Sequence, residues 1–293
     1  MKLLMEILEA ILSLFFRGKR QKVMTPSPFY KELPPPEEVL PRHSLGIDKD
    51  GNEMFITEDI SEEDLAHARE QFRIDNIDKK IVCNDVEIPI DWEDTILWTE
   101  PGALMCKSSQ YKTVSDNRMP SIDKVVVHWD GCLNSAQCAK VLRQRGLSAH
   151  FCIDNDGTIH QLMDTNHVAW HARGVNSKSI GIEISNAVFK EYAHKYDPPR
   201  PMVPKSTLHG KPFPEHMGFY DVQVEALQEL LRSLCSFYNV PLEYPNQNGE
   251  LIRNVIKTST FKGVICHYHI TENKVDPACL DLAKLIEEIK DEI

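Results

Sequence analysis

The chain lacks both an excess of basic residues and a cysteine pattern typical of a disulfide framework. Its 293 residues include 33 Lys and Arg against 44 Asp and Glu, a formal net charge of −11. Nucleic-acid-binding domains carry basic patches, so this balance argues against a nucleic-acid partner. The eight cysteines are scattered and form no Cys-x-x-Cys pair. They are too few to be the framework of a chain this long, and the redox compartment stays open.

No apolar stretch in the sequence is long enough to span a lipid bilayer. The most apolar segment, residues 1–16, carries Lys2, Glu6, Glu9 and Ser13 as a polar stripe at helical spacing. At about 1.5 Å per residue, a helix of this length falls short of the roughly 30 Å hydrocarbon core. Its two glutamates, and the lack of a small-x-small cleavage site after it, also argue against a signal peptide.

Residues 1–24 are predicted to form one unit, an apolar helix followed by a basic segment. Arg17, Lys19, Arg20 and Lys22 follow the apolar run directly. Such a helix can lie in a membrane interface, or it can be buried against a partner chain or against the protein's own body. We prefer burial against protein and keep membrane-surface contact as the alternative.

A proline-rich linker and a hairpin are predicted for residues 25–60. Residues 25–42 hold six prolines, which is typical of an extended, semi-rigid segment. A turn sequence, Asp-Lys-Asp-Gly-Asn, lies within residues 47–56 and predicts a hairpin there.

Residues 61–105 are predicted to be an extension of unknown role. A short helix is expected at residues 61–72, with Ser61 as its cap. Short strands are expected between residues 81 and 100. No residue of this segment belongs to a recognisable chemical motif.

From residue 106 onward, short β-rich runs alternate with helical patterns. Such alternation is typical of an α/β domain with a central mixed β-sheet flanked by helices. We therefore predict one domain over residues 106–293, preceded by the helical and linker extension. The predicted strands are 123–129, a hairpin within 150–163, 178–186 and 264–267, and the predicted helices are 134–145, 221–238 and 277–293.

Two histidines and one carboxylate stand where a catalytic zinc site could take its ligands. His128 and His267 each follow a short β-rich run, and Asp276 lies nine residues after His267. Three such ligands with a fourth position open make up a catalytic zinc site. Spacing alone is a weak signal, because the chain has 12 histidines. Cys279 is a rival third ligand, predicted to lie inside the terminal helix.

Several sequence motifs, in a fixed order along the chain, make the assignment of these possible zinc ligands more specific. They are VVVHWD at 125–130, SAHFCIDNDGTIHQL at 148–162, VAWHAR at 168–173, SIGIEISN at 179–186 and GVICHYHITENKVDP at 263–277. With these motifs, residues 106–293 resemble the zinc-dependent N-acetylmuramoyl-L-alanine amidases, a type shared by phage endolysins, bacterial amidases and peptidoglycan recognition proteins. The first 105 residues lie outside the resemblance.

The resemblance implies a Zn²⁺ cofactor and a role for each residue of the site. His128, His267 and Asp276 would be the metal ligands, Glu183 the general base, and Lys274 the cation that stabilises the oxyanion. A second branch of the family uses a Cys ligand and a tyrosine where this chain has Asp276 and Ala149. Both departures favour the branch with a glutamate base.

The resemblance also implies residues around the cleft. His150 matches a position expected to be structural. Cys132 and Cys138 have the spacing of a short disulfide in peptidoglycan recognition proteins. Their offset from the first metal ligand differs from that of the family disulfide. The two residues could therefore form a disulfide or stay as two free thiols. Five residues are expected to bind substrate: Trp170, His171, Arg173, Asn186 and His269.

These expectations combine into a peptidoglycan hydrolase that cuts the amide between N-acetylmuramic acid and the L-alanine of the stem peptide. The expected partners are peptidoglycan or muropeptides, together with a protein or assembly that contacts residues 1–24. A non-catalytic peptidoglycan-binding module and a structural component of a phage particle, docked through its N-terminal region, are the alternatives. Without a convincing signal peptide, a phage-encoded chain is expected in the host cytoplasm before lysis, or in the virion.

Overall fold

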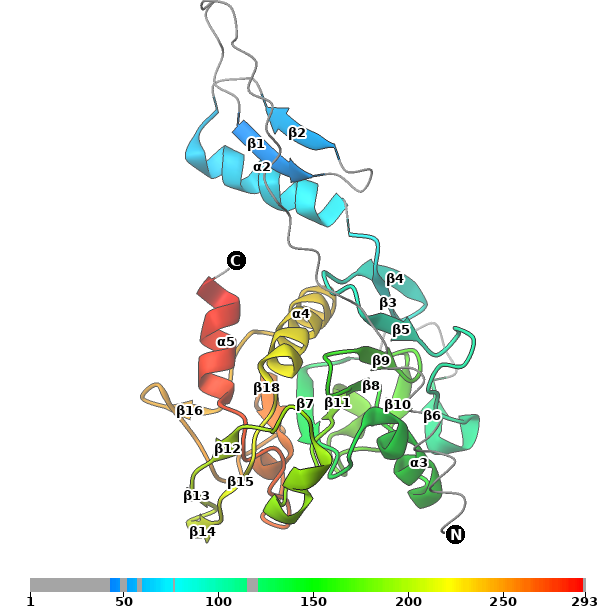
Figure 1. Cartoon of the computed structure of the whole chain (residues 1–293), viewed down its shortest axis with the longest axis vertical. Helices are drawn as coiled ribbons and strands as arrows, with labels where there is room; N and C mark the ends of the chain where they lie inside the picture. The colour runs from blue at the N-terminus through cyan, green and yellow to red at the C-terminus, as the bar shows by residue number, and fades with distance from the viewer. Residues whose placement is uncertain (1–42, 48–51, 57–59, 76, 115–120, 292–293) are drawn as a thin grey trace, which may run out of the picture. The chain divides into compact units, whose positions relative to one another are not determined.

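The computed structural model describes residues 43–47, 52–56, 60–75, 77–114 and 121–291 (Figure 1). The apolar helix predicted within residues 1–24 and the proline-rich stretch 25–42 lie outside the described residues. Among the described helices, none is both long and apolar enough to cross a membrane.

The first described elements are a hairpin and a helix. Strands β1 (His43–Ile47) and β2 (Glu53–Ile56) pair antiparallel, which confirms the hairpin predicted for this segment. Helix α2 spans Glu62–Asp75. The hydroxyl oxygen of Ser61 accepts a hydrogen bond from the Asp64 backbone N–H at 3.1 Å, so the predicted cap is confirmed.

A six-stranded mixed sheet forms the centre of the structure. Its order is β18-β7-β11-β8-β9-β5, with the first four strands parallel, β9 antiparallel to β8, and β5 parallel to β9. The predicted fold class is confirmed. The strand bounds are β5 Thr95–Leu97, β7 Lys124–Trp129, β8 Phe151–Ile153, β9 Ile159–Gln161, β11 Ser179–Ile184 and β18 Gly263–Cys266.

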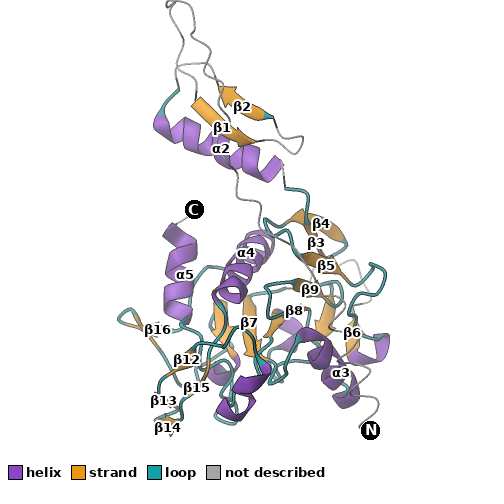
Figure 2. Ribbon diagram, in the orientation of Figure 1, coloured by secondary structure: helices purple, strands orange, loops and turns teal. Residues whose placement is uncertain are grey.

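Helices α4 (Asp221–Tyr238) and α5 (Leu282–Asp291) cover one face of this sheet (Figure 2). Leucines of α4 and α5 share a core with Val125, Val127, Ile180 and Ile182. Successive strand residues point to opposite faces. His128 and Glu183 therefore point to the other face, which we call the site face.

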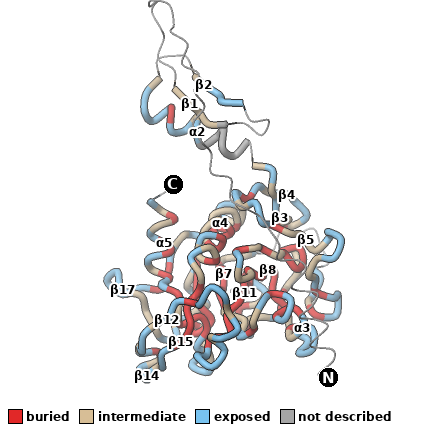
Figure 3. Tube along the Cα trace, in the orientation of Figure 1, coloured by how far each residue is buried: buried red, intermediate tan, exposed pale blue. Residues whose placement is uncertain are grey.

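The third helix, α3 (Ser135–Arg145), packs in a separate cluster that includes Cys138, Leu142 and Cys152. Its ends are those predicted from the sequence. The Asn134 side chain accepts from Gln137 N, and Gly146 ends the helix in the left-handed region with φ +65°. The most deeply buried segments are the central strands and the inward face of α4 (Figure 3).

The terminal helix begins later than the sequence indicated. We expected it from residue 277, because proline favours the first helical turn. Helix α5 starts at Leu282 instead, and the Asp281 carboxylate accepts the Lys284 backbone N–H at 3.1 Å. Cys279 therefore lies in the turn before the helix, not inside it.

The domain was predicted to begin at residue 106, but the packed core includes residues before it. Strand β5 completes the sheet through its pairing with β9. Ile81, Cys83 and Ile90 belong to the core that also contains α4. Residues just before the predicted boundary therefore help to build the sheet that carries the site.

The remaining elements are short strands that pair two by two, and 3₁₀ turns. The strands are β3 Lys80–Cys83, β4 Val86–Pro89, β6 Tyr111–Thr113, β10 His167–Ala169, β12 Met202–Val203, β13 Ser206–Leu208, β14 Lys211–Phe213, β15 His216–Met217, β16 Asn246–Gln247 and β17 Glu250–Leu251, and the 3₁₀ turns are η1 Ser108–Gln110, η2 Asn176–Lys178, η3 Lys190–Lys195 and η4 His267–His269. Within residues 202–217, β13 pairs with β14 and the flanking strands β12 and β15 pair with each other.

All eight cysteines are free thiols. The question left open for Cys132 and Cys138 is therefore answered in favour of two thiols. Cys138 also lies near Cys152, with 3.8 Å between their sulfur atoms.

Candidate metal centre

Two neighbouring parallel strands bring the predicted histidine ligands together. In the register of β7 with β18, Val127 lies opposite Cys266. The next residue on each strand is a histidine, His128 on β7 and His267 directly after β18. Because parallel strands end at the same edge of a sheet, both rings reach the same place.

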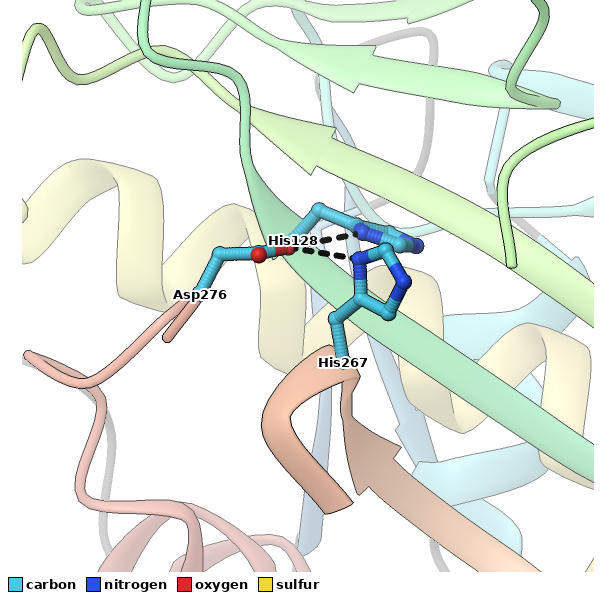
Figure 4. A group of neighbouring side chains, drawn as sticks. All are labelled: His128, His267 and Asp276. Atoms are coloured by element: carbon cyan, nitrogen blue, oxygen red, sulfur yellow. Dashed lines mark hydrogen bonds and ion pairs between the residues drawn. The ribbon is translucent and has the colours of Figure 1, made fainter. Parts of the chain in front are cut away.

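Asp276 completes this group from the loop that follows η4. The Tyr268 backbone N–H donates to the Asp276 carbonyl at 3.1 Å, so the loop folds back on the strand end. Asp276 Oδ2 lies 3.0 Å from Nδ1 of His128 and 2.9 Å from Nδ1 of His267 (Figure 4). A metal ion could be held by three or more His, Cys, Asp or Glu side chains whose ligand atoms lie close together. Among the described residues, His128, His267 and Asp276 form such a group, with their ligand atoms all within 4.8 Å of one another.

The three side chains fit a zinc ion. Bonds of 2.0–2.1 Å in a tetrahedral site place ligand atoms roughly 3.3 Å apart, and Oδ2 of Asp276 lies at a similar spacing from each of the two Nδ1 atoms. All three side chains are buried. Cys279, the rival third ligand, is not in the group.

The protonation states also suit metal binding, which needs neutral imidazoles and an ionised carboxylate. Burial lowers the pKa of His128 to about 4, although the Asp276 carboxylate acts in the opposite direction. Burial alone would raise the pKa of Asp276, but hydrogen bonds from His128 and His267 hold this pKa well below its usual range. The carboxylate is therefore charged and His128 is neutral at neutral pH.

Glu183 lies beside this group on the adjacent strand. It is opposite His128 in the register of β11 with β7, so both side chains point to the site face. Its side chain is 9% exposed, and its Oε2 has no hydrogen-bond partner among the described residues. Burial raises its pKa well above the ordinary value, the carboxylates of Asp276 and Asp130 raise it further, and Lys274 opposes them.

Lys274 lies in the same loop as Asp276. Its positive charge acts on both Glu183 and His128, lowering the pKa of each. Its backbone carbonyl accepts a hydrogen bond from Nε2 of His209 at 2.9 Å. His209 comes from the turn between β13 and β14, so a distant hairpin supports the loop.

Two of the residues expected to bind substrate, His269 and Asn186, are buried and form hydrogen bonds to the protein backbone. His269 is 0% exposed: Nδ1 accepts the Cys266 N–H, and Nε2 donates to the Ile252 carbonyl at 2.7 Å. On an extended segment His269 would face the same way as His267, but the 3₁₀ turn η4 directs it into the interior. Asn186 is also buried, and its amide donates to the carbonyls of Met217 and Gly218. For both residues the polar side-chain atoms are therefore engaged by the protein itself, and contact with substrate stays a prediction.

The other three differ in exposure. Trp170 and Arg173 are exposed and stay candidates for contact with substrate. His171 is partly buried, and both of its ring nitrogens lie near protein atoms, namely Nε2 of His128 and the hydroxyl of Ser179. His150, expected to be structural, accepts the Gly181 N–H and lies within hydrogen-bonding distance of the His167 carbonyl.

The sequence interpretation missed Asp130, which joins the ends of the two strands that carry His128 and Glu183. Its carboxylate accepts the backbone N–H groups of Cys132 and Asn186 and the hydroxyl of Ser185. Burial raises the pKa of Asp130 to about 7. A signal was available, because Asp130 ends the VVVHWD motif.

Arg200 was also missed, and no sequence signal marked it. It is buried, donates to the carbonyls of Ser185 and Gly218, and lies between the rings of Tyr196 and Tyr220, 4.4 Å from each centroid. Its hydrogen bond to Ser185 holds the loop after β11 against the end of that strand.

Comparison with known proteins places this geometry in context. A family model described as N-acetylmuramoyl-L-alanine amidase matches residues 117–279, more than half of the chain. No curated protein matches the chain.

Among solved structures, the chain is similar to the N-acetylmuramoyl-L-alanine amidase LysC from Clostridium intestinale URNW, with 16% identity over 68% of this chain and 99% of that one and a TM-score of 0.40. It is similar to the amidase AmiD from E. coli, solved in complex with the substrate anhydro-N-acetylmuramic acid-L-Ala-D-gamma-Glu-L-Lys, with 18% identity over 58% of each chain and a TM-score of 0.38. It is also similar to the Ph2119 endolysin from Thermus scotoductus MAT2119 bacteriophage Ph2119, with 15% identity over 62% of this chain and 91% of that one and a TM-score of 0.37.

Proposed function

The chain belongs to the N-acetylmuramoyl-L-alanine amidase family, and from this we propose that it is a zinc-dependent peptidoglycan hydrolase. It cuts the amide that joins the lactyl group of N-acetylmuramic acid to the L-alanine of the stem peptide. The observation that carries the proposal is the convergence of His128, His267 and Asp276 beside the buried carboxylate of Glu183.

His128, His267 and Asp276 would hold the metal. When bound, zinc supplies a Lewis acid and lowers the pKa of water to about 7. Three protein ligands would leave a fourth position open, as in catalytic zinc sites.

Glu183 is the general base in this proposal. Its carboxylate takes a proton from the attacking water, whose oxygen forms the new bond to the amide carbon. The same carboxyl group then gives the proton to the leaving nitrogen as the C–N bond breaks. Proton transfer by a positioned side chain contributes about 10²–10⁴-fold. The Oε2 atom, without a hydrogen-bond partner among the described residues, is free for this task.

Lys274 stabilises the negative charge that develops on the carbonyl oxygen. A fixed positive group at such a position is worth about 10²–10³-fold in rate. Its charge lowers the pKa of Glu183, which supports this role. The His209 ring donates a hydrogen bond to its backbone carbonyl.

The bond that is cut can be identified from the products. We expect the purified, zinc-loaded protein to release stem peptides that begin with a free L-alanine amine, and glycan chains that keep the free lactyl carboxylate. Mass spectrometry of digested peptidoglycan distinguishes these products from those of glycosidases and cross-link peptidases. Binding to the wall without release of free L-alanine amines would favour the non-catalytic binding module instead.

His209→Asn is expected to slow the reaction without affecting zinc. Asparagine tolerates the left-handed backbone at this position, φ +53°, but its side chain is too short to reach the Lys274 carbonyl. A 1 Å misplacement of a catalytic group can lower the rate by about 10²-fold. We therefore expect His209→Asn to lower kcat by no more than this factor, and by less than the complete loss of the amine in Lys274→Ala. The measurement is kcat with zinc content determined in parallel.

The exposed Lys211, on the same hairpin, provides the matched control as Lys211→Ala, which should behave as the native chain. A His209→Asn variant with native kcat would show that the hairpin does not position Lys274.

A further inference from the structure

We propose that His171, backed by Ser179, is a positioning residue that fixes the His128 ring with Nδ1 toward the metal, and that it does not contact substrate. This inference rests on the proposed zinc site. It assigns a different task to a residue for which the family resemblance implied contact with substrate.

The contacts of His128 occupy both of its ring nitrogens. Nδ1 lies 3.0 Å from Oδ2 of Asp276, and Nε2 lies 3.0 Å from Nδ1 of His171. The rings of His128 and His171 meet edge to face, with an interplanar angle of 85° and centroids 5.2 Å apart. The orientation of His128 is therefore fixed from two sides.

His171 is itself anchored to the backbone. Its Nε2 lies 3.2 Å from the hydroxyl oxygen of Ser179, and that hydroxyl donates to the Val175 carbonyl at 3.0 Å. Ser179 is the first residue of β11 and is buried. A line of hydrogen bonds therefore runs from Asp276 through two imidazoles and one hydroxyl to a fixed main-chain oxygen.

Gly181 makes room for this arrangement. A Cβ at position 181 would lie 2.5 Å from Cγ of His171, far inside van der Waals contact. The His171 ring therefore lies directly against the backbone of β11, between the strand and His128. A ring held in this position, with both nitrogens engaged, has no nitrogen left for a substrate.

The hydrogen bonds from His128 to Val175 can all form when a metal binds Nδ1 of His128. A neutral imidazole carries one N–H, so a metal at Nδ1 leaves the proton on Nε2, which donates to Nδ1 of His171. The proton of His171 is then on Nε2 and donates to Ser179, whose own proton goes to Val175. Each acceptor in this line receives one proton.

The metal-free protein favours the opposite direction. Nδ1–H of His128 then donates to Asp276, and Nε2 accepts from Nδ1–H of His171. In this arrangement the Ser179 hydroxyl must turn from the Val175 carbonyl and donate its proton to Nε2 of His171. Each ring carries one proton in both arrangements, because the proton lost at Nδ1 is replaced at Nε2. Zinc binding should therefore switch the tautomer of His171, a residue that the metal does not touch. A substrate contact would show no such switch.

The test measures zinc affinity, by competition with a chelator, for the native chain and for His171→Phe, His171→Asn and Ser179→Ala. Loss of a group that orients a metal-binding histidine typically costs about 10–100-fold in metal affinity, and we expect this loss for His171→Phe. Asparagine keeps an acceptor near the position of Nδ1, so His171→Asn should recover most of the affinity. Ser179→Ala should lie between them. The exposed His67 of α2 gives the matched control, His67→Phe.

Nitrogen-15 NMR of the native chain gives the second readout, the change of the His171 tautomer from Nδ1–H to Nε2–H when zinc is added. It decides the question even if His171→Phe fails to fold. Native zinc affinity in His171→Phe, or an unchanged His171 tautomer, would overturn the inference while the zinc site stands. A native chain that binds no zinc would overturn the proposed function and this inference with it.

Discussion

Glu183→Gln is expected to lower the rate of amide cleavage by about 10²–10⁴-fold, the contribution of a general base, while zinc binding stays native. Glutamine has nearly the same shape and fills the same buried site, but it cannot accept a proton from water. Glu183 is not among the three converging ligands, so the metal should remain. The measurement is kcat together with zinc content.

The same substitution should stabilise the metal-free protein at neutral pH. Burial, and then the carboxylates of Asp276 and Asp130, raise the pKa of Glu183 well above the ordinary value, which is about 4.3 in an unfolded chain. Between these two pKa values the folded state binds more protons than the unfolded state, so the free energy of unfolding falls as the pH rises. Glutamine does not ionise and avoids this loss.

Thermal unfolding of the metal-free proteins at several pH values checks this second effect. We expect equal stability at low pH, where Glu183 is protonated in both states, and a higher Tm for Glu183→Gln above that range. Glu225→Gln, an exposed change on α4, should alter neither rate nor Tm. A Glu183→Gln variant that kept the native rate would exclude this residue as the base.

The convergence of the candidate ligands could be predicted because their signals are local and ordered. His128 and His267 end short apolar runs, and ends of parallel strands meet at one edge of a sheet. The register of β7 with β18 then places the two histidines side by side. Asp276 was a candidate from its position nine residues after His267, but a carboxylate in a loop has no periodicity to mark it, and the family resemblance was needed to prefer it to Cys279.

The contacts that His269 and Asn186 make depend on structure that the local sequence pattern does not contain. His269 would share a face with His267 on an extended strand, but the chain enters the 3₁₀ turn η4 and buries it. Asn186 binds carbonyls of Met217 and Gly218, which come from a segment without regular periodicity. Such partners are set by tertiary packing.

His171 shows the same limit in another form. Its motif correctly placed it near the site, but the neighbour that its ring meets depends on a strand pairing and on one glycine. Gly181 leaves space for the ring against β11, and the register of β11 with β7 brings His128 beside it. Proximity could be predicted from the sequence, whereas the direction of the ring nitrogens could not.

Asp276→Ala is expected to abolish both tight zinc binding and amidase activity. Asp276 is the charged member of the proposed ligand set, and both Nδ1 atoms converge on its Oδ2. Hydrogen bonds from these two histidines outweigh the effect of burial and hold its pKa well below the usual range. The substitution therefore removes a permanent negative charge from the place where the cation would bind.

Zinc-dependent stabilisation measures this loss without using activity. A ligand present at 100 times its Kd stabilises the folded state by about 2.7 kcal/mol, so the native chain should gain this much at that zinc concentration and Asp276→Ala far less. Each protein must be compared with its own metal-free form. The variant leaves two buried imidazoles without their acceptor, and an unmade buried hydrogen bond costs about 1–3 kcal/mol by itself.

Glu272→Ala provides the matched control, since Glu272 is exposed in the same loop and its loss should leave the zinc effect intact. Native zinc stabilisation in Asp276→Ala would contradict the proposed ligand set. In that case Cys279 becomes the third ligand to test, because it is the nearest thiol along the chain, three residues beyond Asp276. Cys279→Ala should keep full zinc binding if Asp276 is the ligand, and lose it if the thiol has that role. The pair of variants therefore assigns the third ligand whichever way the result falls.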